Sequence, residues 1–202
     1  MTAPKPYSES CNQNREPIYD IIQALLSNKK HVLEIGSGTG QHAVYFAQKM
    51  PHLVWQTSDQ LSYHQGIKQW LSEANLNNTP EPIALDVSND NWPDAFTPVI
   101  DAIFFANAVH IMSWKNVVDF MRNAPPLLAQ GGLFILYGPF NYQGKYSSES
   151  NAHFDIWLKQ NNPQSAIRDF EALNELAEHQ GLTLLKDYSM PANNRLLCWQ
   201  KN

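Results

Sequence analysis

The sequence predicts an α/β fold built on a doubly wound, mostly parallel sheet, on the basis of two observations. Residues 31–35 are short, apolar and β-branched, and a glycine-rich turn and apolar residues at helical spacing over 41–50 follow them. Further apolar runs of strand length then alternate with helical patterns along the chain. A strand, a glycine turn and a helix in this order often begin the ligand site of such a sheet.

The helices are predicted from apolar spacing and from residues typical of helix ends. Pro17 fits a first turn and Asn14 could cap it, so the first helix is expected at about 15–27. Pro125-Pro126 must bend or break the fourth helix, and Gly131-Gly132 is expected to end it. The full set is expected at about 15–27, 41–50, 61–75, 113–129 and 169–180, with a short helix at 156–158.

The strands are predicted from short apolar runs. Segment 101–106 is almost wholly apolar, as is typical of a strand that is covered on both faces. The turn at 190–194 joins the last two runs as a hairpin, and Trp92-Pro93 predicts a short helix or turn. The strands are expected at 31–35, 53–57, 82–85, 101–106, 133–137, 182–188 and 196–200.

Bulk properties limit the class of protein. A length of 202 residues predicts one domain over 1–202, and a net charge of −5 makes nucleic acid a poor candidate partner. Cys11 and Cys198 have no metal or disulfide spacing, which fits a reducing cytosol. With no apolar leader and no membrane-length apolar run, we expect a cytoplasmic protein with no membrane partner and no metal. No feature of the sequence indicates an oligomeric state.

The glycine turn is the first candidate binding site. Glycines allow positive φ angles and a close approach of ligand to backbone, and the following helix start offers free N–H groups. An acidic residue, Glu34, stands two positions before Gly36, where it would favour a cation and repel a pyrophosphate. A nicotinamide site and a glycine turn without any ligand are the alternatives.

This E-x-G-x-G-x-G pattern resembles motif I of class I S-adenosylmethionine (SAM)-dependent methyltransferases. SAM carries a sulfonium and an ammonium group, so an adjacent carboxylate suits it. The resemblance implies that SAM is the cofactor and that the turn binds it through Glu34, Gly36, Ser37, Gly38 and Gly40.

Two acids at strand ends extend the predicted cofactor site. Asp59 lies about twenty residues beyond the glycine turn, where an acid binds ribose hydroxyls in doubly wound folds, because a carboxylate accepts from both. The alternative is that Asp59 caps the helix that starts near 61. Asp86 matches the methyltransferase position that binds the adenine amino group, with the N–H of Val87 beside it, or else it only closes a turn.

Asn107 and His110 follow strand 101–106, and carboxyl ends of strands carry the site in open α/β sheets. This segment resembles the Asn-x-x-His segment of many small-molecule methyltransferases and lacks the Asn/Asp-Pro-Pro-Tyr/Phe motif of enzymes that methylate nucleobase amines. Asn107 and His110 would lie beside the methyl group there and are the candidate catalytic residues, and Asn107 is also a candidate cofactor-binding residue. His110 is a candidate general base, because histidine titrates near neutrality, or it only orders the loop.

Stretches along nearly the whole chain resemble a small methyltransferase-like family first catalogued as a domain of unknown function. The resemblance implies a Rossmann-like sheet of seven strands in the order 3-2-1-4-5-7-6, with strand 7 antiparallel. It also implies an N-terminal segment, 1–30, that closes over the cofactor, and 141–165 is expected to be a substrate lid. The stretches are 14–18, 33–42, 58–59, 85–87, Asn107, 138–140, 150–151 with 154–155, 167–169 and 190–194.

Membership of that family would make several otherwise ordinary polar residues part of the site. Arg15 would contact the cofactor or a carboxylate of the substrate, or else it is a solvated arginine, and His42 is either a ligand contact or a surface histidine of its helix. The substrate would be bound by Phe140, Asn151, Asp155, Arg168 and Asn193.

Two functional hypotheses follow. The first is a SAM-dependent methyltransferase that transfers the methyl group in line to an O or N atom of a small molecule, for which the protein mainly supplies approach and orientation. The second is a regulatory protein that binds SAM or S-adenosylhomocysteine (SAH) without turnover. A nicotinamide oxidoreductase is a distant third, and Glu34 argues against it.

Overall fold

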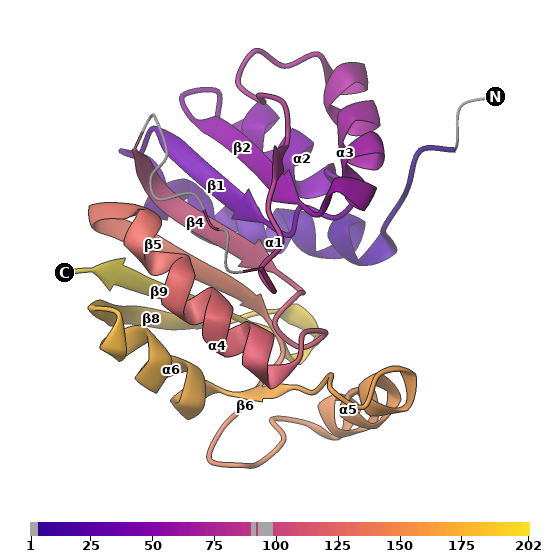
Figure 1. The fold of residues 1–202 in the computed structure, drawn as a ribbon, viewed down its shortest axis with the longest axis vertical. Coiled ribbons are helices and arrows are strands. Elements are labelled where there is room, and N and C mark those ends of the chain that lie inside the picture. The colour runs from indigo at the N-terminus through magenta and orange to yellow at the C-terminus, as the bar shows by residue number, and fades with distance from the viewer. Residues whose placement is uncertain (1–3, 90–91, 93–98) are drawn as a thin grey trace.

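The computed structural model describes residues 4–89, 92 and 99–202, and its centre is a seven-stranded sheet (Figure 1). The strand order is β3-β2-β1-β4-β5-β9-β8, and β9 runs antiparallel to both of its neighbours. Numbered by chain order within this sheet, that is 3-2-1-4-5-7-6, which confirms the predicted order. The strands are β1 (His31–Ile35), β2 (Val54–Asp59), β3 (Ile83–Ala84), β4 (Ile100–Ala106), β5 (Leu128–Gly138), β8 (Leu182–Ser189) and β9 (Arg195–Lys201).

Helices cover both faces of the sheet. On one face α1 (Glu9–Leu25), α2 (Gln41–Lys49) and α3 (Leu61–Ala74) pack side by side. On the other face α4 (Trp114–Asn123) packs beside α6 (Phe170–His179). Figure 1 shows α4 and α6 in front of the sheet.

The strands divide their side chains between these two layers. In β4, Ile103 and Phe105 join the core under α4, whereas Ala102 and Phe104 join the core under α2. All four side chains are at most 2% exposed. Burial on both faces explains why this strand is almost wholly apolar, as the sequence predicted.

The first helix differs from the prediction. It begins six residues earlier, at Glu9, where the Ser8 hydroxyl accepts a hydrogen bond from the N–H of Cys11. Pro17 consequently lies inside α1 rather than in its first turn. A proline has no N–H, so the carbonyl of Gln13, one turn earlier, receives no helical hydrogen bond.

Residues 124–132 also differ from the prediction. The proline pair ends α4 and starts a short 3₁₀ turn, η1 (Pro125–Leu127), after which the chain enters β5. Gly131 and Gly132 therefore lie in a strand and do not end a helix. They lie where the pairing of β4 with β5 shifts register, and Gly131 has a φ of +73°. A glycine accommodates this irregularity because it tolerates positive φ.

The segment after β5 holds more regular structure than the sequence predicted. β6 (Phe140–Asn141) pairs with β7 (Arg168–Asp169) outside the main sheet, and α5 (Glu149–Asn161) runs well beyond the short helix expected at 156–158. A second 3₁₀ turn, η2 (Pro191–Asn193), joins β8 to β9. Of the helix or turn expected at Trp92-Pro93, Pro93 lies outside the described residues, as do the first three residues of the 1–30 segment.

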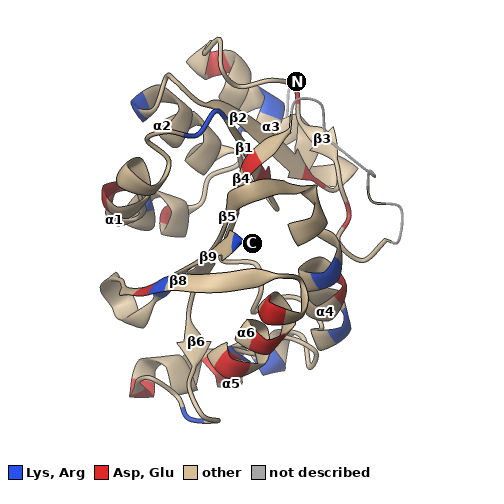
Figure 2. Ribbon diagram, turned by 90° about the vertical axis from the view of Figure 1, so that its left-hand side faces the viewer, with Lys and Arg blue, Asp and Glu red and all other residues tan. Residues whose placement is uncertain are grey.

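Charged residues lie mainly on the helices and at strand ends. Figure 2 shows both signs of charge spread over several elements, while the long strand β5 carries none. Within the described ranges, no helix combines the length and the apolar character needed to cross a membrane. The same residues contain no group of three or more histidine, cysteine or acidic side chains arranged to hold a metal ion.

Candidate functional site

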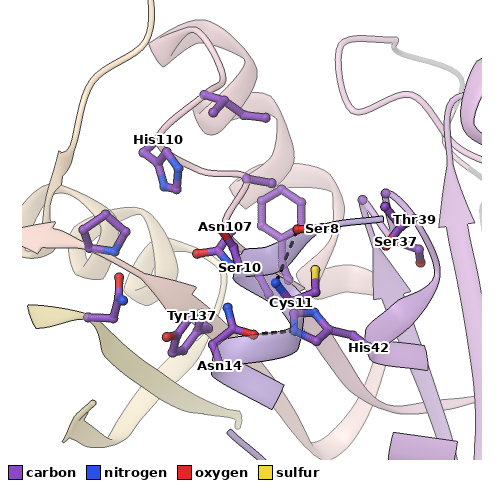
Figure 3. A pocket seen from close by; sticks show the side chains of 18 of the residues that line it. Ser8, Ser10, Cys11, Asn14, Ser37, Thr39, His42, Asn107, His110 and Tyr137 are labelled. Atoms are coloured by element: carbon purple, nitrogen blue, oxygen red, sulfur yellow. Dashed lines mark hydrogen bonds between the residues drawn. The ribbon is translucent and has the colours of Figure 1, made fainter. Parts of the chain in front are cut away.

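A cavity of about 1000 Å³ lies at the carboxyl ends of β1, β2, β4 and β5, where open α/β sheets bind their ligands (Figure 3). Its wall combines the glycine turn, α1, the loop after β4, α5 and η2. From the predicted site, the wall includes Gly36, Ser37, Gly38, His42, Asp59, Val87, Asn107, His110 and Asn151.

The glycine turn is shaped for close approach by a ligand. Gly36 has a φ of +65°, and an added Cβ there would lie 3.0 Å from the ring of Phe105. Gly38 also has a positive φ, +57°, but a Cβ added to it would meet no atom within 4 Å. Its backbone therefore faces open space, so a ligand can lie against it.

Asp59 connects the glycine turn to the end of β2. Its carboxylate accepts hydrogen bonds from the N–H of Gly38 and of Gln60, each at 2.7 Å. Burial raises the pKa of Asp59, and these two hydrogen bonds oppose the rise. The cap residue of α3 is Gln60, without a side-chain cap, so Asp59 does not serve as the helix cap that was the alternative to ribose binding.

Glu34 lies beneath the turn and not in the cavity wall. It is 2% exposed, and its carboxylate accepts a hydrogen bond from Trp55 Nε1 at 3.0 Å. Burial raises the pKa of Glu34 to about 8. Its backbone carbonyl also receives the hydroxyls of Ser37 and Ser58, so Glu34 holds the turn against β2.

Three other predicted cofactor residues also lie outside the wall. The Asp86 carboxylate accepts the N–H and hydroxyl of Ser88, which hold its pKa below the ordinary value. Arg15 places its guanidinium 4.8 Å from the ring centroid of Tyr45. Gly40 caps α2 at a φ of +87° and supports the turn from behind.

Asn107 and His110 lie together in the loop after β4 (Figure 3). Asn107 has a φ of +56°, uncommon for a residue with a side chain, and its N–H donates to the carbonyl of Tyr137 at 2.8 Å. His110 is 7% exposed, and burial, with the positive charge of Arg168, lowers the pKa of its imidazole to about 4. The ring is therefore neutral at pH 7 and can accept a proton or a hydrogen bond.

Across the cavity, α1 and β5 contribute a set of neutral polar groups. Asn14 Oδ1 lies 2.7 Å from His42 Nε2. Burial lowers the pKa of His42 to about 4. Burial also raises the pKa of Tyr137 to about 12, and hydrogen bonding to Asn194 and Asn14 offsets part of this rise. Figure 3 shows Asn14, Tyr137 and Asn107 directed into the same space.

Residues 5–8, just before α1, are hydrogen-bonded to side chains of α2 and α3 next to the glycine turn. The amide of Gln41 accepts from the N–H of Ser8 at 2.5 Å and donates to the Ser8 carbonyl at 3.2 Å. Its oxygen also accepts from the Thr39 hydroxyl at 3.0 Å. Trp70 Nε1 donates to the carbonyl of Pro6, and Lys5 pairs with Glu73. These contacts hold the segment before α1 against α2 and α3.

Helix α5 closes the far end of the cavity. Asn151 lies in the wall and donates from its amide to the hydroxyl of Ser147 at 2.8 Å and the carbonyl of Asn193 at 3.1 Å. Asn193 in turn donates to the Ser150 hydroxyl. These hydrogen bonds join the start of α5 to η2, so Asn193 positions the wall from outside it.

The remaining predicted substrate residues, Asp155, Arg168 and Phe140, do not line the cavity. Asp155 is 2% exposed and accepts from Tyr146, Lys159 and the N–H of Ile167 at 2.6–2.8 Å. Arg168 donates to the carbonyls of Met112 and Gln164. Phe140 is 1% exposed and belongs to the core.

Aromatic rings link the outside of the cavity to His110. The rings of Trp157 and Phe154 are stacked, with their centroids 5.8 Å apart and an angle of 13° between their planes. The ring of Phe154 contacts the imidazole of His110 edge-on, with the two centroids 5.4 Å apart. All three residues line the cavity, but Trp157 is 56% exposed whereas His110 is buried. We call these three residues the aromatic stack.

The family model described as "Protein of unknown function (DUF938)" matches residues 5–201. The chain belongs to this family. Because the match covers nearly all of the chain, every part of the wall described above lies within it.

Three solved structures resemble this DUF938 chain over 95–96% of its length, and each of the three is below 20% identical to it, so they show the fold alone. They are the SAM-dependent methyltransferase SibL in its apo form (TM-score 0.79, 18% identity), the mitomycin 7-O-methyltransferase MmcR (0.82, 14%) and human N-acetylserotonin methyltransferase in complex with SAM (0.79, 14%). The DUF938 chain covers 53–55% of these three chains, about half of their length. Its fold is the Rossmann-like fold of class I methyltransferases.

Several wall residues of this DUF938 protein were not predicted from the sequence. Tyr137 follows a rule that the sequence analysis applied to Asn107, because it lies at the carboxyl end of a central strand. Asn14 was interpreted as a helix cap, and Trp157 as part of a short apolar run. Both lie in segments that were expected to cover the site, 1–30 and 141–165, but the sequence did not single out either residue as part of the cavity wall.

Proposed function

We propose that this protein is a methyltransferase that uses SAM to methylate an O or N atom of a small molecule. The observation that carries the proposal is one cavity that holds both the glycine turn with Asp59 and, further along, Asn107, His110 and Tyr137. A volume of about 1000 Å³ is at the upper end of the range for ligand pockets, which leaves room for a cofactor and an acceptor together.

The residues at the cofactor end of the cavity, around the glycine turn and Asp59, fit SAM. Asp59 offers carboxylate oxygens to two ribose hydroxyls, and the backbone at Gly38 lies open to a ligand. We assign Val87, which lines the cavity, to the adenine, with Asp86 presenting the turn behind it. Gly36 and Ser37 would lie against the amino-acid end, and Glu34 would hold this part of the turn in place.

When bound, SAM supplies a methyl group on a positively charged sulfur, so the leaving group needs no further activation. The chain's own contribution is orientation: Asn107 and Tyr137 direct hydrogen-bonding groups at the acceptor, and the walls exclude water. A neutral His110 can accept the proton that an O or N acceptor loses. Its lowered pKa makes it a weak base, so this role suits an acceptor whose proton is already acidic.

The first experiment is thermal unfolding with SAM, SAH and NAD in parallel. A ligand at about a hundred times its dissociation constant stabilises the folded state by about 2.7 kcal/mol, which raises Tm by about 5–10 °C for a chain of this size. We expect the rise with SAM and SAH only. A rise with NAD alone would contradict the proposal.

The weak basicity of His110 also favours a second candidate, a protein that binds SAM or SAH without turnover. The two functions separate when the protein is incubated with methyl-labelled SAM and fractions of a metabolite extract. A methyltransferase transfers label to at least one fraction, and His110→Gln slows that transfer while SAH affinity is kept. A regulatory protein binds SAH and labels no fraction.

A further inference from the structure

The acceptor end of the cavity carries no formal charge. Among the described residues of the wall, the only acidic or basic side chain besides the two histidines is that of Asp59, and it lies at the cofactor end. The two histidines in the wall are buried without a carboxylate partner. The hydrogen-bonding groups around the acceptor are amides and hydroxyls, among them Asn14, Asn107 and Tyr137.

Two charged side chains lie near this end but outside the wall. Arg168 donates from one terminal nitrogen to the backbone carbonyls of Met112 and Gln164, its buried Nε has no hydrogen-bond partner among the described residues, and its positive charge also acts on His110. Asp155 accepts hydrogen bonds from Tyr146, Lys159 and a backbone N–H. A charged acceptor would lose its hydration in the cavity and find no counterion in the wall, which is costly. An uncharged acceptor would lose little hydration free energy on entering the cavity.

The aromatic stack gives the acceptor end its shape. Trp157 and Phe154 lie nearly parallel on α5, and Ile111, which also lines the cavity, is 54% exposed. Flat rings gain stacking energy on such faces, and aliphatic chains of the same polarity gain less. The stack ends at His110, next to the polar groups on which a hydroxyl could be oriented.

We propose that the methyl acceptor is an uncharged, planar aromatic molecule with a hydroxyl group, which enters along the aromatic stack and places its hydroxyl among His110, Asn107 and Tyr137. The proposal rests on the proposed function, because it assumes that SAM fills the cofactor end of the cavity. It adds the acceptor class, a route of access and a role for Trp157 in selecting the acceptor.

The test measures binding of three probes to the full chain saturated with SAH, by titration calorimetry at neutral pH. The probes share one ring system and one hydroxyl: 2-naphthol is neutral, 6-hydroxy-2-naphthoate is anionic and 6-(aminomethyl)-2-naphthol is cationic. We expect 2-naphthol to bind at least about tenfold more tightly than either charged probe, a difference of about 1.4 kcal/mol.

Two results would overturn the inference alone. They are SAH binding followed by no binding of 2-naphthol, and SAH binding followed by equal or tighter binding of a charged probe. Failure of SAH itself to bind would overturn the proposed function, and this inference would fall with it. The first titration thus separates the two failures.

A matched pair of variants on α5 tests the route of access. Trp157 and Ile156 are neighbours with 56% and 53% exposure, but only Trp157 lines the cavity. We expect Trp157→Ala to weaken 2-naphthol binding by about three- to tenfold and to leave SAH affinity unchanged. Ile156→Ala should change neither. Equal effects of the two variants would refute a specific role for the stack.

A gain of binding tests the charge argument. Ile111→Lys places a cation at the mouth of the cavity, on a side chain that is exposed and outside the core. We expect it to tighten binding of 6-hydroxy-2-naphthoate at least threefold relative to 2-naphthol. An unchanged ratio would mean that the neutrality of the wall does not select the acceptor.

Discussion

Replacing Asp59 with asparagine tests the cofactor end of the cavity. The wild-type carboxylate accepts one N–H on each oxygen, from Gly38 and from Gln60. Asparagine keeps one oxygen and turns an NH₂ group toward the other donor, so one charge-assisted hydrogen bond is lost. Such bonds contribute about 1.5–3 kcal/mol, so we expect Tm to fall by about 3–12 °C.

The same substitution should weaken cofactor binding, because one ribose hydroxyl loses its acceptor. A loss of about 1.5–3 kcal/mol corresponds to a SAH affinity about 10- to 150-fold lower, measured by titration calorimetry below the Tm of the variant. Asp101→Asn is the matched control. Asp101 also accepts two backbone N–H groups, from Lys30 and His31, but at the opposite end of the sheet.

We expect Asp101→Asn to bind SAH as wild type does, since it removes the same charge far from the cavity. If Asp59→Asn bound SAH with wild-type affinity, the assignment of Asp59 to the ribose would be refuted. An equal loss in both variants would refute it too, because the effect would then come from net charge or from general destabilisation.

Three further predictions concern buried polar groups. The pKa of His110 in the folded chain, about 4, lies below that of an unfolded histidine, so the free energy of unfolding should fall as the pH is lowered from 6.5 to about 4. The fall should be less steep in His110→Gln. If the urea midpoints of wild type and variant changed equally with pH, this prediction would be contradicted. The pKa of Glu34 is raised to about 8, so this residue should cost stability as pH rises toward about 8.5, and Glu34→Gln should flatten the urea midpoints between pH 6.5 and that value. Gln41→Ala removes the hydrogen bonds to Ser8, so we expect about tenfold weaker SAH binding and faster proteolysis before α1; unchanged affinity would show that this fastening does not affect the cofactor.

The central strands could be predicted because each carries its own evidence in the sequence, whereas their order in the sheet was predicted from the resemblance to class I methyltransferases. β1 and β4 are mostly apolar, interrupted only by His31 and Glu34 in β1 and by Asp101 in β4, as burial on both faces favours. The start of α1 could not be placed as well, because its first two turns face the cavity and solvent and so lack an apolar period. Ser8, the actual cap, is a common cap residue, but nothing apolar near it marked a helix.

Gly131 and Gly132 show a second limit. A glycine pair after a helical pattern usually marks a helix end, and here the two prolines had already ended the helix. The glycines instead accommodate an irregular pairing between β4 and β5, a feature that depends on a strand 30 residues away in the chain. The register of that pairing cannot be predicted from the residues next to the glycines.

The site residues also fall into some that sequence spacing predicts and some that depend on tertiary packing. Asp59 was placed in the cavity from its distance along the chain, because a fixed fold converts that spacing into a position. The acid of the glycine motif, Glu34, points to Trp55 beneath the turn, and sequence spacing does not report the direction of a side chain. Asn14 and Tyr137 meet only because the fold brings α1 to the carboxyl end of β5, a tertiary contact without a local signal.

The wall of the cavity draws on both ends of the sequence. Residues before and in α1 form one side, and η2 and Asn194, close to the last strand, form another. β9, the strand that follows η2, also pairs with β5 inside the sheet. A nascent chain that has formed the glycine turn and Asp59 therefore still lacks the surfaces that complete the cavity, so cofactor binding must wait until η2 and β9 have been synthesised. Ligand-induced protection would then mark only molecules whose translation has passed this last turn.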